Sequence, residues 1–113
     1  MYKTINGWTK EKMIEHVKKN FKGQAMDENG DCFYLMEDGR KCAVGLFIPD
    51  GHESQAYKGT SLELLLKYKD LIDIMPLEKI GLNMFQRMHD SMNFNDVEEE
   101  TRELINWIEK NVA

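Results

Sequence analysis

The chain of 113 residues has only two cysteines and two prolines, and it has no long apolar run. A membrane span needs roughly 18 consecutive apolar residues, and residues 1–6 also lack the apolar core of a secretion signal. These absences predict one globular domain over residues 1–113, located in the cytoplasm and without a membrane partner. Two cysteines are also too few for a disulfide scaffold.

Familiar catalytic and cofactor motifs are absent as well. The sequence contains no Walker lysine loop, no dinucleotide-binding fingerprint and no paired metal-binding helix motif. It therefore specifies no reaction and predicts no cofactor. The sequence leaves open whether the protein is an enzyme, and the absence of these motifs favours a non-enzyme.

Acidic residues gather in the second part of the chain. Residues 42–113 carry thirteen acidic and seven basic side chains, a composition that disfavours nucleic acid as a partner. A protein with a basic surface would be attracted to the acidic end. The residues expected to bind it are Glu99, Glu100, Glu103 and Trp107. The ordinary alternative is a solvated first helical turn and a half-buried tryptophan.

Helix-start signals recur along the chain. Thr9 can cap a helix over residues 10–21, Thr60 a short helix, and Asp96 the last helix, while Pro76 can open another. The apolar stripes expected on these helices are Met13, Ile14, Val17 and Phe21; Leu62, Leu65, Leu66 and Ile72; Leu77, Ile80, Met84 and Met88; and Val97, Thr101, Leu104, Ile105 and Ile108. The fourfold spacing of Met84, Met88 and Met92 is likewise interpreted as core.

The segment from residue 31 to residue 49 has the character of a strand pair. Asp38–Gly39 is typical of a two-residue type I′ turn, and a hairpin centred there pairs Leu35 with Cys42. The alternative for the second arm is a short buried helix that begins near Lys41 and ends before Pro49, and short strands around the turn followed by such a helix are favoured, because Ala43 and Leu46 are helix formers. The predicted fold class is α+β: a mostly helical single domain of four to five helices with one small antiparallel β-hairpin around Asp38–Gly39.

Cys42 is the candidate nucleophile. A helix that begins near Lys41 would place the sulfur at the positive end of the helix dipole and lower its pKa. With His89 and Asp90 close by, Cys42 could serve a small hydrolase or transferase. No local signature supports this chemistry, and the ordinary interpretation is a buried cysteine that packs as a small hydrophobe.

The two cysteines have two other conceivable roles. A zinc site could combine Cys32, Cys42, His52 and His89, but their spacing matches no known zinc motif, so we expect no metal. A disulfide is disfavoured by the reducing cytoplasm and by the hairpin register, which places Cys32 opposite Gly45.

A small-ligand pocket is a further possibility, with Tyr34, Lys41, Gln86 and His89 as the candidate residues for a small anionic, nucleotide-like ligand. Gln86 and His89 are three residues apart and so share one face of a helix, away from the Leu77 stripe. The ordinary alternative makes His89 a helix-end residue without a ligand.

Three separated patterns resemble a group of small phage and prophage proteins of unassigned function. The matching residues are Cys32 and Tyr34; Gly39, Lys41, Cys42, Ala43, Gly45, Ile48, Pro49 and Asp50; and Gln86, His89 and Asp90. The resemblance implies a phage-borne accessory protein in a bacterial cytoplasm and carries no catalytic role. We expect such a protein to bind a host protein, either to inhibit a bacterial defence or to redirect host machinery.

Overall fold

The computed structural model describes residues 1–23, 25, 33–91 and 96–113. Within these ranges the chain forms α-helices linked by short 3-10 helices and contains no strand. The elements are α1 (Lys10–Asn20), η1 (Val44–Phe47), η2 (Glu53–Ala56), α2 (Ser61–Lys67), η3 (Lys69–Asp73), α3 (Lys79–Asp90) and α4 (Val97–Asn111). In this described part, no helix is long and apolar enough to span a membrane.

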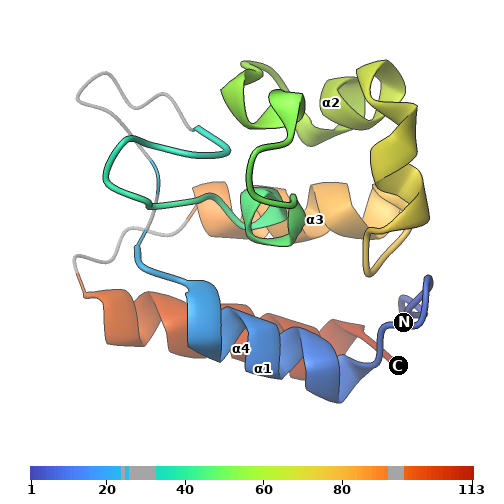
Figure 1. Cartoon of the computed structure of the whole chain (residues 1–113). Helices are drawn as coiled ribbons and strands as arrows, with labels where there is room; N and C mark the ends of the chain where they lie inside the picture. Colours follow the sequence, from blue (N-terminus) through green and yellow to red (C-terminus); the bar gives the residue numbers. More distant parts are fainter. Residues whose placement is uncertain (24, 26–32, 92–95) are drawn as a thin grey trace.

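The elements are arranged in three layers (Figure 1). α1 and α4 lie side by side in one layer, α3 and η1 form the middle, and α2 lies in the other outer layer with η2 and η3. The two chain ends meet beside α4, where the N–H of Tyr2 donates to the carbonyl of Asn111 (2.7 Å) and that of Ala113 donates to the carbonyl of Tyr2 (2.8 Å). The first and last residues are thereby fixed to the same edge of the domain.

Three of the predicted helix starts are confirmed. Thr9, Thr60 and Asp96 each accept a hydrogen bond from a backbone N–H two or three residues further on, at 3.1, 3.2 and 2.9 Å. Each cap satisfies an N–H group that has no partner inside its helix. These contacts are local, so the sequence alone was enough to place them.

The helix expected to open at Pro76 begins three residues later, at Lys79. A helix that started at Pro76 would need its carbonyl to accept from the N–H of Ile80. In the structure the N–H of Ile5 donates to the carbonyl of Pro76 (2.9 Å), so the N-terminal segment supplies the donor in place of Ile80.

The expected buried stripes of α2 and α3 are wrong in part. Leu62, Leu66, Ile80 and Met84 are exposed, and Met88 is half-buried, whereas Met92 lies outside the described residues. The buried residues of α3 are Gly81, Leu82, Phe85, Gln86 and His89. α3 is therefore rotated relative to the sequence prediction, with its polar residues Gln86 and His89 directed into the protein.

The predicted β-hairpin around Asp38–Gly39, and with it the α+β class, is also wrong. Gly39 has φ +91°, but Asp38 does not share the positive φ that a type I′ turn requires at both positions. The N–H of Gly39 donates to the carbonyl of Met36 (3.0 Å), and the N–H of Met36 donates to the carbonyl of Arg40 (2.9 Å). The chain thus makes a three-residue loop whose arms do not continue as strands.

The second arm instead forms the buried helix that was the alternative prediction. Ala43 has right-handed helical dihedrals, and η1 follows it and ends ahead of Pro49. In the predicted register the N–H of Val44 would donate to the first arm, because alternate residues of an antiparallel pair are hydrogen-bonded, but in the structure it donates to Oε1 of Gln86. Tertiary contacts therefore replace the hairpin hydrogen bonds.

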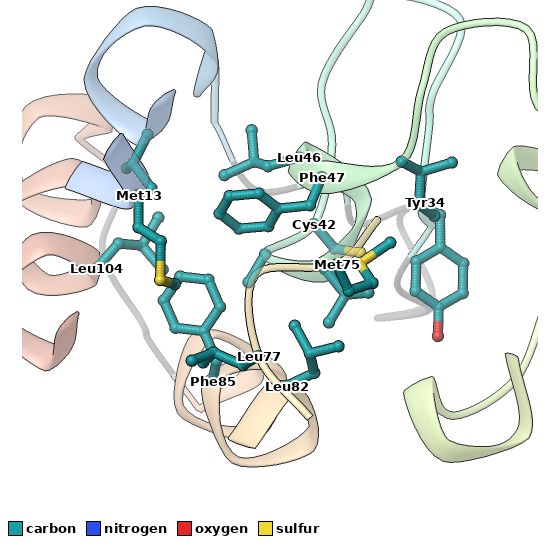
Figure 2. Close-up of a cluster of buried hydrophobic side chains, with 14 of the residues drawn as sticks. Met13, Tyr34, Cys42, Leu46, Phe47, Met75, Leu77, Leu82, Phe85 and Leu104 are labelled. Atoms are coloured by element: carbon teal, nitrogen blue, oxygen red, sulfur yellow. The ribbon is translucent and has the colours of Figure 1, made fainter. Parts of the chain in front are cut away.

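η1 carries its side chains into the centre of the core. Figure 2 shows Leu46 and Phe47 in the upper part of the cluster, above Phe85 and Leu82 of α3, with Met13 of α1 at one edge and Tyr34 at the opposite edge. The approach is close: a Cβ on Gly45 would lie 2.2 Å from the carbonyl oxygen of Tyr34. Only glycine fits at this position.

We therefore expect Gly45→Ala to lower the free energy of unfolding by about 3 kcal/mol or more, because the methyl group meets backbone rather than a movable side chain. Denaturant unfolding would measure the change. Gly7→Ala is the matched control: Gly7 has φ +79° and nothing near its Cβ position, so its cost is confined to about 1 kcal/mol of backbone strain. Equal losses for the two variants would contradict the steric explanation.

Candidate functional site

Residues singled out in two separate segments of the sequence, Cys42 in one and Gln86 and His89 in the other, meet at the start of η1. Three successive N–H groups are satisfied there by side chains: Ala43 donates to Nδ1 of His89 (2.9 Å), Val44 to Oε1 of Gln86 (2.9 Å), and Gly45 to Sγ of Cys42 (3.4 Å). All three N–H groups are buried. The arrangement gives hydrogen-bond partners to the first N–H groups of a helix that starts inside the protein.

His89 is fully buried, and burial lowers its pKa from 6.5 to about 4, while nearby Asp90 opposes part of this shift. The imidazole is therefore neutral at neutral pH, and because Nδ1 accepts from Ala43, its proton is on Nε2. The ring also meets Phe21 edge-on, with centroids 5.4 Å apart.

A cavity of about 370 Å³ lies next to this cluster, between α2, α3 and the segment around Tyr34. Its lining residues are Tyr34, Cys42, Gly59, Thr60, Ser61, Leu62, Asn83, Gln86, Arg87 and Asp90. Hydrogen bonds fix several of these groups: Tyr34 Oη donates to the carbonyl of Gly59 (2.9 Å), and Gln86 Nε2 donates to Oδ1 of Asp90 (2.7 Å). Several polar groups of the cavity are thus fixed in advance.

Burial is the main reason that the pKa of the Tyr34 phenol lies far above its ordinary value, and the neighbouring Cys42 and Asp90 raise it further. The phenol therefore stays protonated and keeps its hydrogen bond to Gly59 at any ordinary pH.

The candidate ligand residues lie at different places in the structure. Tyr34 and Gln86 line the cavity. His89 lies in the cluster behind it, and Lys41 forms an ion pair with Asp50, with Nζ and Oδ1 2.8 Å apart. The basic and imidazole groups expected to bind an anion are thus placed elsewhere.

The three candidate catalytic residues lie near one another, but each has a structural contact. Cys42 is only 2% exposed and accepts from Gly45, His89 accepts from Ala43, and Asp90 accepts from Gln86. These contacts describe a buried capping cluster and do not require catalysis to explain them.

Metal ligands are not gathered in the described part of the chain, where no three His, Cys, Asp or Glu side chains are close enough to hold an ion. His52 bonds to Asp70 instead, with Nε2 and Oδ2 2.6 Å apart, and its Nδ1 accepts from the N–H of Ser54. Cys32 lies outside the described residues, as do the zinc and disulfide hypotheses that involve it.

The four residues expected to bind a protein partner do not share one surface. Glu99 and Glu103 are exposed, whereas Glu100 is only 4% exposed. Trp107 is half-buried and stacks on Tyr2, with centroids 5.8 Å apart and planes 19° apart; its ring also contacts Phe85 at 5.0 Å. The tryptophan therefore joins the chain start to α3 and α4.

The sequence analysis missed a set of exposed apolar side chains on α2 and α3. It consists of Leu62, Leu66, Ile80 and Met84, which are 38%, 60%, 71% and 40% exposed, and we call it the α2–α3 face. These residues were assigned to the core because they recur at helical spacing. The competing stripe of Leu82, Phe85 and His89 was the signal that could have revealed the true orientation of α3.

Comparison of the chain with protein-family models, curated proteins and solved structures finds no significant match. The resemblance to small phage proteins therefore stays a prediction. Its separated residues Tyr34, Cys42, Gln86, His89 and Asp90 nevertheless lie in or beside one cavity and capping cluster.

Acid should weaken the fold through His89. Between pH 6.5 and about 4 the unfolded chain binds a proton at this histidine that the folded chain does not, so stability falls as the pH drops through this window. We expect a loss on the order of 3 kcal/mol, measured by denaturant unfolding at a series of pH values. His89→Asn, whose amide oxygen can accept from Ala43 without titrating, should flatten the profile. A variant profile parallel to that of the unsubstituted protein would assign the acid sensitivity to another group.

The thiol of Cys42 should react slowly. In a Cys32→Ser background we expect an aromatic disulfide reagent to label the native protein at least about a hundredfold more slowly than the unfolded chain, because the sulfur is covered. Labelling as fast as in denaturant would show an accessible thiol and restore the nucleophile hypothesis.

Proposed function

We propose that the protein is a binding module that engages a partner protein through the α2–α3 face. The observation that carries this proposal is the exposure of four large apolar side chains on two adjacent helices of a small domain. Such clusters expose apolar area to water at a free-energy cost, and they are characteristic of interaction surfaces.

The relative placement of the two helices supports a shared surface. Ser61 Oγ, at the start of α2, donates to Oδ1 of Asn83 in the middle of α3 (3.3 Å). Leu65, near the end of α2, lines a second cavity together with Ile80, near the start of α3. α2 therefore runs antiparallel beside α3.

Each helix contributes two exposed side chains one turn apart. Leu62 and Leu66 are four residues apart on α2, and Ile80 and Met84 are four apart on α3. The buried side of α3 packs in the core through Leu82 and Phe85, so its exposed pair is held in place before any partner arrives. A preformed surface of this kind binds with little ordering cost.

The charged residues around the face suit a partner with both apolar and polar sides. Glu63 and Lys67 are exposed on α2, and Lys79 and Arg87 on α3, so charges of both signs are present, three of them basic. An amphipathic helix of the partner would place its apolar side between Leu62, Leu66, Ile80 and Met84 and its polar groups at the charged rim. The resemblance to phage proteins suggests a host protein of a bacterial cytoplasm as this partner.

The acidic end of α4 has weaker support as the binding surface. Glu100 is buried, Trp107 packs against Tyr2 and Phe85, and the carboxylates of the first turn already stabilise the positive end of the helix. Charge reversal on α4 is consequently the matched control for substitutions on the α2–α3 face.

The double variant Leu66→Lys, Ile80→Lys should weaken partner binding at least about tenfold, because two charged groups would have to be desolvated in the interface. The measurement is calorimetric titration with the partner after affinity capture from bacterial lysate has identified it. Both positions are exposed, so we expect each substitution to change folding stability by no more than about 0.5 kcal/mol.

Glu99→Lys, Glu103→Lys is the control variant, and it should retain the partner. Loss of binding in this variant, with full binding by the α2–α3 variant, would place the interface on α4 and refute the proposal. Unchanged binding in both variants would refute it equally.

A further inference from the structure

The cavity beside the capping cluster has one charged group of each sign. Arg87 and Asp90 both line it, and they lie three residues apart on α3, so their side chains project from one face of the helix about one turn apart. The other lining residues are uncharged. Two further cations are adjacent in sequence to lining residues: Lys41 is held by Asp50 at 2.8 Å, and Nζ of Lys58 lies over the ring of Phe33, 5.5 Å from its centroid.

The uncharged lining divides into polar and apolar parts. Ser61 and Asn83 bond to each other (3.3 Å) on the wall between α2 and α3, and Tyr34 is fixed by its bond to Gly59. Leu62 and Cys42 supply the apolar part. A volume of about 370 Å³ is at the lower end of the roughly 300–1,000 Å³ typical of small-molecule sites.

We infer that this cavity binds a small zwitterion of the α-amino-acid type. The planar guanidinium of Arg87 can donate two parallel hydrogen bonds to a carboxylate. The carboxylate of Asp90, oriented by Gln86 at 2.7 Å, can accept from an ammonium group and offset its charge. The ligand's side chain lies against Leu62 and Cys42.

The same charge balance argues against phosphates and nucleotides. A phosphate group requires a surplus of positive charge, whereas the single cation of this cavity faces an anion one turn away. This inference differs from the small anionic ligand that the sequence suggested through Lys41 and His89. It is also a separate claim from the protein-binding proposal, although Leu62 belongs to both sites and Arg87 is one of the charged residues around the α2–α3 face.

The test is a thermal-shift screen of the full chain with the free L-α-amino acids at millimolar concentration, followed by calorimetric titration of those that stabilise it. Glucose, inorganic phosphate and adenosine monophosphate form the comparison set. We expect at least one amino acid to raise Tm and every member of the comparison set to leave it unchanged.

Two variants assign the binding to the cavity. Arg87→Gln and Asp90→Asn should each raise the Kd of the amino acid at least about tenfold, whereas Arg102→Gln, at another exposed arginine, on α4, should leave it unchanged. Asparagine at position 90 can still accept from Gln86, so that variant keeps the wall of the cavity intact. No response to any amino acid, a response confined to the comparison set, or full affinity in both cavity variants would overturn the inference.

Discussion

Two side chains of α3 hold the segment on which the core is built. His89 and Gln86 accept hydrogen bonds from the N–H groups of Ala43 and Val44, in a region that water does not reach. An N–H group buried there without an acceptor would cost about 1–3 kcal/mol. The two bonds fix η1 against α3, and the side chain of Phe47 then packs against Phe85. The central layer in Figure 1 therefore depends on a polar contact placed inside an apolar core.

The same contact determines which residues the protein presents to the outside. Successive helical residues are about 100° apart, so turning Gln86 and His89 inward carries Ile80 and Met84 to the solvent side. The exposed α2–α3 face is thus a consequence of the hydrogen bonds that Gln86 and His89 accept inside the protein. Residues that resemble catalytic candidates in the sequence, Cys42 and His89, act in the structure as hydrogen-bond acceptors for backbone N–H groups.

The two proposed binding sites lie next to each other on this framework. The α2–α3 face is apolar, with charges of both signs around it, and suits a protein segment. The neighbouring cavity is small, lined by hydroxyl and amide groups, and contains one arginine and one aspartate. Leu62 belongs to both, so a molecule in the cavity would lie directly beside a partner on the face. α4, whose acidic end is prominent in the sequence, lies in the opposite outer layer from α2 (Figure 1), with Glu100 buried and Trp107 packed against Tyr2.

The sequence by itself determined the features that depend on neighbours a few residues away. Thr9, Thr60 and Asp96 cap their helices as predicted, because a cap needs only an N–H two or three residues along the chain. The orientation of α3, the loss of the hairpin and the convergence on one cavity were decided by tertiary structure. α3 carries apolar residues on more than one side, and which side is buried rests on hydrogen bonds from Ala43 to His89 and from Val44 to Gln86, whose partners are 46 and 42 positions apart in the chain. Such bonds leave no periodic trace in the sequence, since their partners become neighbours only after the chain has folded.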